Sequence, residues 1–158
     1  MSKQSDYTAE EWDNIASAPI FTGLYVTSAD LSGPIGMIKE MAAVMKAVFE
    51  AAEGSQTELI KGVADEIKAR QGKFKKPDIS GKDAAGMRAL LLDQIRGAAA
   101  AVAHKSPGEG EEYRQWLMAL AHKSAEAAKE GGFLGFGGTP VSEEEGHALR
   151  ELASALGQ

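Results

Sequence analysis

Apolar side chains recur every three or four positions along most of the 158-residue chain. Three short stripes and two longer ones follow this spacing: Leu59, Ile60, Val63 and Ile67; Tyr113, Trp116, Leu117 and Leu120; Leu149, Leu152, Ala153 and Leu156; Ile38 to Ala52; and Met87 to Val102. The spacing matches the 3.6-residue turn of a helix that buries one face. It predicts five amphipathic helices.

Polar residues that cap helices stand before several of these stripes. In a capping box, a hydroxyl and a carboxylate three residues later satisfy the free N–H groups at a helix start. Three pairs fit this motif and one fits it more weakly: Thr8 with Glu11, Ser55 with Glu58, Ser142 with Glu145, and the weaker Ser80 with Asp83. Tyr7 and Trp12 flank the first cap at the spacing of a hydrophobic staple.

Residues 19–30 are the ambiguous part of the pattern. Ile20, Leu24 and Thr27 fit a short helix that begins after Pro19, whereas residues 24–27 alone would also fit a strand. We prefer the helix. With predicted loops near 53–55, 71–80, 105–109 and 130–142, the sequence predicts an all-α fold, a single compact bundle of six or seven helices with glycine-rich loops.

Composition narrows the class of protein. The 44% hydrophobic content suits one domain spanning residues 1–158, with an N-terminal arm at 1–7 and a glycine-rich loop at 130–142. A net charge of -6 argues against a nucleic-acid binder, and the absence of cysteine excludes disulfides and thiolate metal sites. The polar start lacks a signal-peptide pattern, and no apolar window is long enough to span a membrane. We expect a soluble cytoplasmic protein.

The glycine-rich loop carries a dense apolar cluster at Phe133, Leu134 and Phe136. A phosphate cradle is excluded, because the dinucleotide-binding glycine spacing and the P-loop lysine are both missing and three glutamates open the next helix. Two interpretations remain. The three side chains either anchor the loop in the core, or form a surface for partner binding or self-association.

Glu144 and His147 have the E-x-x-H spacing that places two metal-binding side chains on one helical face. A di-iron bundle needs a second such motif, and neither His104 nor His122 follows a glutamate at that distance. The alternative is that the acidic run compensates the helix dipole and is solvated.

A basic segment at residues 68–76 carries five cations without an acid: Lys68, Arg70, Lys73, Lys75 and Lys76. These side chains would suit an anion or an acidic membrane surface. The alternative is that the first two offset a helix C-terminus while the others keep a loop soluble.

The stretch AHKSAEAAKEGGFLGFGGTPVSEEEGHALRELASALG resembles the unit of TerB-like tellurite-resistance domains. Ser142 caps the last helix, Glu145 follows it, and leucines at the family spacing lead to Gly157, while Asp30 and Glu40 echo the pattern earlier. The resemblance implies an all-helical fold, an association with divalent metal through acidic residues, and a role in stress response.

No nucleophile motif such as G-x-S-x-G is present, so we expect a non-catalytic binding or scaffolding module without a cofactor, with a protein partner or self-association. One alternative is a metal-dependent protein that uses the set Asp30, Glu40, Glu144 and His147. Another is a peripheral anion or membrane-surface binder that uses the basic segment.

Overall fold

The computed structural model describes residues 2–29, 33–71, 73, 74, 78, 80–130 and 141–158, with backbone alone at 33–40 and 128–130. Its elements are the short 3-10 helix η1 (Gln4–Asp6) and the helices α1 (Ala9–Thr27), α2 (Gly33–Gly54), α3 (Glu58–Ala69), α4 (Ala84–Lys105), α5 (Pro107–Glu130) and α6 (Glu143–Leu156). The described residues contain no strand. The predicted all-α bundle is confirmed, with six α-helices in this part of the chain.

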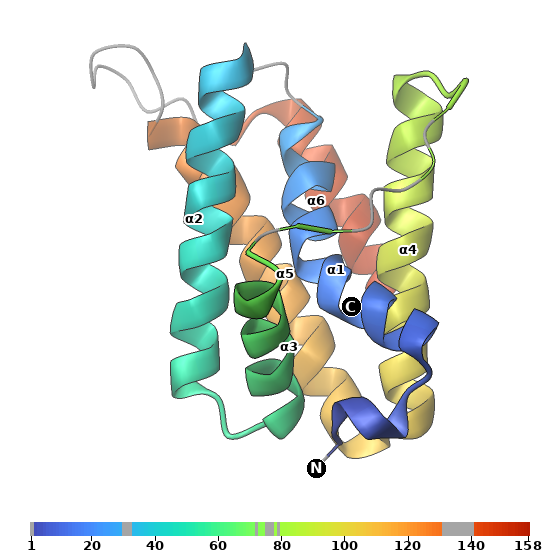
Figure 1. The fold of residues 1–158 in the computed structure, drawn as a ribbon. Helices are drawn as coiled ribbons and strands as arrows, with labels where there is room; N and C mark the ends of the chain where they lie inside the picture. Colours follow the sequence, from blue (N-terminus) through green and yellow to red (C-terminus); the bar gives the residue numbers. More distant parts are fainter. Residues whose placement is uncertain (1, 30–32, 72, 75–77, 79, 131–140) are drawn as a thin grey trace.

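Helix α1 lies at the centre of the bundle and contacts each of the other five helices (Figure 1). It is buried over most of its second half, which is the apolar run that was ambiguous in the sequence. Around it, α2 packs against α3 and α5, while α4 packs against α5 and α6. This position lets α1 form one wall of a groove beside α4.

Most of the predicted stripes contribute to the core, but the stripe of α2 is only partly buried, with Val48 inside, Phe49 half-buried and Ala42 exposed. All of the stripe residues of α3 and α5 are buried, and Ile95, Ala98 and Val102 of α4 join them. The α6 stripe is shifted slightly, because Ala148 is fully buried while Leu149 is only half-buried.

Two predicted capping boxes are confirmed, at Thr8 before α1 and at Ser142 before α6. The other two predictions were wrong. The hydroxyl of Ser55 donates to Glu112 of α5 instead, and α3 begins after Thr57 with no side-chain cap. Helix α4 begins after Asp83, whose carboxylate accepts from the backbone N–H of Gly86, so this aspartate is the N-cap itself.

Helix α1 also corrects the prediction of a helix that begins after Pro19 and the alternative of a strand at 24–27. Pro19 lies inside one continuous helix. Because proline has no N–H, it leaves the carbonyl of Ile15 without its helical donor. The fully buried Tyr113 of α5 donates its hydroxyl to that carbonyl at 2.8 Å. A partner 98 residues away therefore stabilises the helix across the proline.

The N-terminal arm packs over the turn between α4 and α5. Tyr7 and Trp12 confirm the predicted staple, with ring centroids 5.9 Å apart. The backbone N–H of Ser2 donates to Glu109 at 2.7 Å, and the Tyr7 hydroxyl lies 3.0 Å from that of Ser106. In the part of the chain described, no helix combines the length and hydropathy needed to cross a membrane.

Candidate functional site

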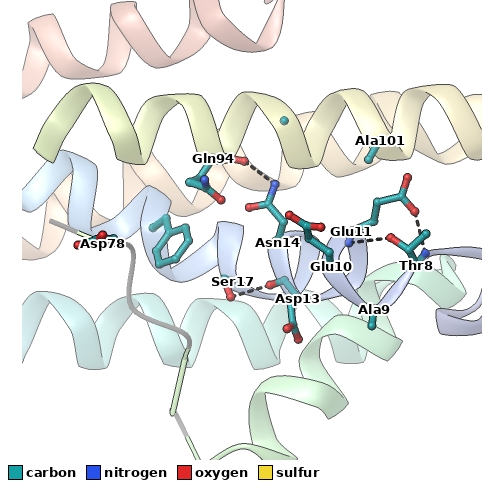
Figure 2. A pocket seen from close by; sticks show the side chains of 12 residues that line it. Thr8, Ala9, Glu10, Glu11, Asp13, Asn14, Ser17, Asp78, Gln94 and Ala101 are labelled. Atoms are coloured by element: carbon teal, nitrogen blue, oxygen red, sulfur yellow. Dashed lines mark hydrogen bonds between the residues drawn. The ribbon is translucent and has the colours of Figure 1, made fainter. Parts of the chain in front are cut away.

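A groove of about 750 Å³ runs between α1, α4 and the segment that precedes α4 (Figure 2). Its rim carries four carboxylates, from Glu10, Glu11 and Asp13 of α1 and from Asp78 of that segment. Its apolar lining comes from Ala9, Phe21, Gly97 and Ala101. Among the described residues that line it, none is a lysine, arginine or histidine, so its charge is negative.

The first half of α1 forms one wall because residues 10, 13, 14 and 17 follow helical spacing on one face. On the opposite wall, Gln94, Gly97 and Ala101 share a face of α4. The amide of Asn14 donates to the backbone carbonyl of Gln94 at 3.1 Å. A Cβ atom on Gly97 would lie 3.3 Å from that amide, so glycine gives Asn14 the room to join the two walls.

Two of the rim carboxylates, Glu11 and Asp78, accept hydrogen bonds that favour the charged form. A hydrogen bond from Lys105, at 2.6 Å, is the main cause that lowers the pKa of Glu11 to about 2. Hydrogen bonds from Ser80 lower the pKa of Asp78. Asp13 lies 2.6 Å from the guanidinium of Arg70. Glu11 and Asp78 are therefore ionised at neutral pH, and two rim positions already bind a cation from the chain itself.

This arrangement suits a cationic ligand with an aliphatic portion. The carboxylates supply acceptors for ammonium or guanidinium groups, and Ala9 and Ala101 offer apolar surface for the stem of a long basic side chain. Glu10 is exposed and lies at the open rim, where an incoming cation would meet it.

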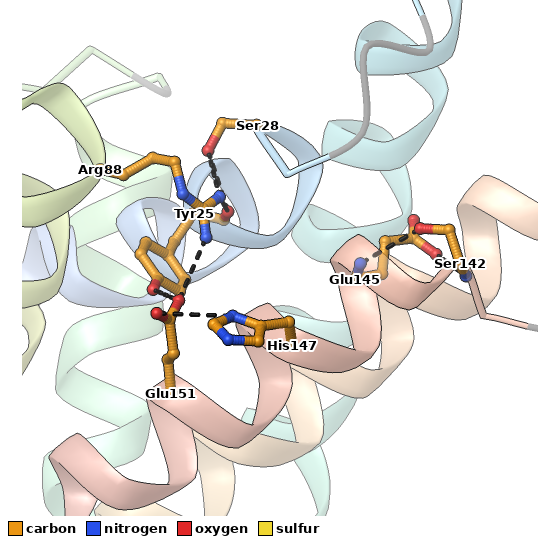
Figure 3. Close-up of polar contacts among 7 residues, drawn as sticks. All are labelled: Tyr25, Ser28, Arg88, Ser142, Glu145, His147 and Glu151. Atoms are coloured by element: carbon orange, nitrogen blue, oxygen red, sulfur yellow. Dashed lines mark hydrogen bonds and ion pairs between the residues drawn. The ribbon is translucent and has the colours of Figure 1, made fainter. Parts of the chain in front are cut away.

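A second polar cluster lies where the C-terminal end of α1 meets α4 and α6 (Figure 3). The Tyr25 hydroxyl donates to Glu151 at 2.6 Å, and Arg88 lies 4.4 Å from the Tyr25 ring centroid and 3.4 Å from Glu151. Arg88 also donates to the Tyr25 carbonyl at 3.0 Å and to the Ser28 hydroxyl at 3.2 Å. On the solvent side, His147 lies 3.4 Å from Glu151. The cluster connects three helices.

Proton affinities in this cluster follow from those contacts. Burial, followed by the hydrogen bond to Glu151, raises the pKa of Tyr25 to about 12. The same hydrogen bond is the main cause that lowers the pKa of Glu151, with further contributions from His147 and Arg88. At neutral pH the tyrosine is protonated and the glutamate ionised, which is the state that holds the cluster together.

Two of the predicted metal ligands, Glu144 and His147, line a shallow depression beside this cluster. Arg88 lines the same depression, and its charge opposes a bound cation. Asp30 lies outside the described residues, and the structure describes Glu40 only as part of the α2 backbone. Within the described residues, no group of three histidine or acidic side chains is arranged to hold a metal. The metal site stays a prediction.

The members of the predicted anion-binding segment differ in their surroundings. Arg70 lies 2.6 Å from both Asp13 and Glu66, so its charge is neutralised within the chain. Lys68 and Lys73 are exposed. Two further members fall outside the described residues: Lys75 and Lys76. Anion binding here stays a prediction.

The apolar cluster of the glycine-rich loop also lies outside the described residues, which end at Glu130 and resume at Val141. Phe133, Leu134 and Phe136 therefore stay a prediction, both as core anchors and as a partner surface.

Sequence reasoning did not find the acidic groove. The run Thr8 to Asp13 was interpreted only as a helix start, although its three carboxylates within four residues were a visible signal. Tertiary packing brings these carboxylates close to α4 and Asp78, and no local sequence pattern predicts such packing. Comparison with known proteins adds no relative: no family model, curated protein or solved structure matches this chain.

Proposed function

We propose that the protein is a non-catalytic binding module whose α1–α4 groove receives a basic segment of a partner protein. The observation that carries this proposal is the composition of the groove. It combines four carboxylates with apolar residues and uncharged polar ones, and no basic side chain is among its described lining residues. Electrostatic complementarity of this kind favours association with a positively charged partner and excludes acidic ones.

The pairs that the chain already makes at this rim support the same proposal. Arg70 and Lys105 each approach a groove carboxylate at 2.6 Å, from α3 and α4 respectively. They demonstrate that both kinds of basic side chain fit the rim. The partner would add its cations at Glu10 and Asp78, which form no ion pair within the described residues.

The shifted pKa values favour binding over proton-transfer chemistry. A general acid or base works best when its pKa lies near the operating pH. Here the shifted carboxylates, such as Glu11 and Glu151, are held further below neutrality, and Tyr25 and Tyr113 are raised further above it. Near neutral pH these shifts keep the carboxylates ionised and the tyrosines neutral, so the charges of the binding scaffold do not change.

The test is the affinity for a fluorescein-labelled peptide of alternating lysine and alanine, measured by fluorescence anisotropy. Glu10→Lys replaces an attraction by a repulsion at the rim and should weaken binding by about tenfold. Glu126→Lys is the matched control, because Glu126 is 61% exposed on α5, which does not line the groove, and the net charge changes equally. A glutamate–alanine peptide should not bind.

Equal weakening by both variants would mean that the peptide responds only to the net charge of the protein. A lack of binding by the wild-type protein at low salt would also overturn the proposal.

A further inference from the structure

A second groove, of about 450 Å³, lies between α2 and α3, which are neighbouring helices in Figure 1. Its floor is apolar, with Phe49 and Ala52 from α2 and the buried Ala64 from α3. Phe49 is only half-buried, although it packs against the core. The groove is separate from the α1–α4 groove and shares no lining residue with it.

The outer face of α3 carries a regular alternation of charge. We call Glu58, Lys61, Asp65 and Lys68 the charged face of α3, since they fall within about 80° of arc at the 100° per residue of a helix. Three of these four side chains are exposed, and Lys61 is half-buried. None of them takes part in an ion pair within the described part of the chain, which has nine pairs elsewhere.

The charged face of α3 complements itself when two copies run antiparallel. The pairs 58 with 68 and 61 with 65 are both centred on position 63, so a two-fold axis there places each acid opposite a lysine. A parallel arrangement would instead place identical charges opposite each other. Self-complementarity about a two-fold axis is the defining feature of an isologous interface.

From this charge pattern and the adjoining apolar groove, we infer that the α2–α3 face joins two copies of this chain in a two-fold dimer. Phe49 and Ala52 form the apolar centre, and the charged face of α3 forms the rim that sets the antiparallel register, as in other interfaces. A purely basic or purely acidic partner would meet repulsion at half of the rim. A second copy meets attraction at each of the four positions of the charged face of α3, and Glu53 of α2 is a further acid beside the groove that this pairing does not use.

Charge reversal at the central pair tests this register. Lys61→Asp places aspartate at both 61 and 65, and Asp65→Lys places lysine at both, so each variant alone repels its own copy. Each should raise the dimer dissociation constant by at least about tenfold. The double variant, with the two charges exchanged, again places opposite charges at 61 and 65 across the axis and should dimerise again.

An equimolar mixture of the two single variants gives the most specific test of this pairing. The acidic variant should pair with the basic one and form a heterodimer, although neither associates with itself. Lys123→Asp and Asp93→Lys are matched controls, because they make the same charge changes at exposed sites on α5 and α4. They should leave the dissociation constant unchanged within about twofold.

Sedimentation velocity from about 5 to about 500 µM protein gives the readout, since self-association follows mass action. Circular dichroism checks that each variant is folded. A wild-type chain that stays monomeric over this range would overturn the inference. Dimers that survive both single reversals, or a double variant that stays monomeric while folded, would likewise place the contact elsewhere.

Discussion

The proline inside α1 gives the sharpest test of how the bundle is held together. Tyr113→Phe removes only one hydroxyl, and it leaves the carbonyl of Ile15 without a donor from either Pro19 or α5. That carbonyl lies beside side chains with no solvent exposure, at Ile15 and Tyr113 themselves. The burial that raises the pKa of Tyr113 well above its usual value also keeps the hydroxyl protonated as a donor.

A buried group that loses its hydrogen bond costs about 1–3 kcal/mol. We therefore expect Tyr113→Phe to lower the free energy of unfolding by about 2 kcal/mol, which is about 6 °C in melting temperature for a chain of this size. In a Pro19→Ala background, residue 19 can supply the helical N–H to Ile15. The same Tyr113→Phe change should then cost about half as much.

Urea unfolding followed by circular dichroism measures the four corners of this cycle. Tyr25→Phe is the matched control, because its ring is buried but its hydroxyl partner, Glu151, is 41% exposed and can be hydrated. Its cost should not depend on Pro19. If Tyr113→Phe costs the same in both backgrounds, the hydroxyl does not compensate for the proline.

Three further predictions concern packing, pH and capping. Gly23→Ala would place a Cβ atom 2.8 Å from the buried Val44, so the free energy of unfolding should fall by about 1–2 kcal/mol. In a Val44→Ala background the clash is absent, and the same change should raise the free energy of unfolding because alanine favours the helix. The pKa of Glu11 is about 2, against an ordinary 4.5, so ionised Glu11 stabilises the fold above pH 4.5 and this contribution is lost as pH falls toward 2. In Lys105→Met, the urea midpoint should therefore fall less steeply over this pH range. Ser142→Ala should cost about 1 kcal/mol in thermal unfolding by removal of the α6 cap.

Each of these has a clear contrary result. A stabilising Gly23→Ala in the wild-type background would mean that α1 and α2 have room at their crossing. An unchanged acid profile in Lys105→Met would remove the ion pair as the cause. A neutral Ser142→Ala would mean that water replaces the cap without cost.

The helices could be predicted because their signals are local. Stripes such as Leu59 to Ile67 and the boxes at Thr8 and Ser142 depend on residues within a turn or two of each other. Two of the failures involve partners from elsewhere in the chain. Ser55 donates its hydroxyl to Glu112 of α5, and Pro19 is tolerated because Tyr113 bonds the carbonyl that it leaves free. Neither partner is near Ser55 or Pro19 in the sequence.

The candidate site was less predictable for the same reason. Glu144 and His147 do share a helical face, as their spacing requires, but His147 turns to Glu151 and Arg88 lies nearby. Arg70, which was one candidate for anion binding, is paired with Asp13. Spacing fixes which side chains share a face, whereas tertiary contacts decide which of them are free to bind.

The central claim is that the α1–α4 groove binds a basic partner segment. The most direct measurement is a titration of the ¹⁵N-labelled protein with the lysine–alanine peptide, followed by amide chemical shifts. We predict that the largest changes cluster at Glu10, Asp13, Asn14 and Gly97, the facing walls of the groove. Shifts spread evenly over exposed acidic residues of α5 and α6, with none concentrated at these four amides, would contradict the account.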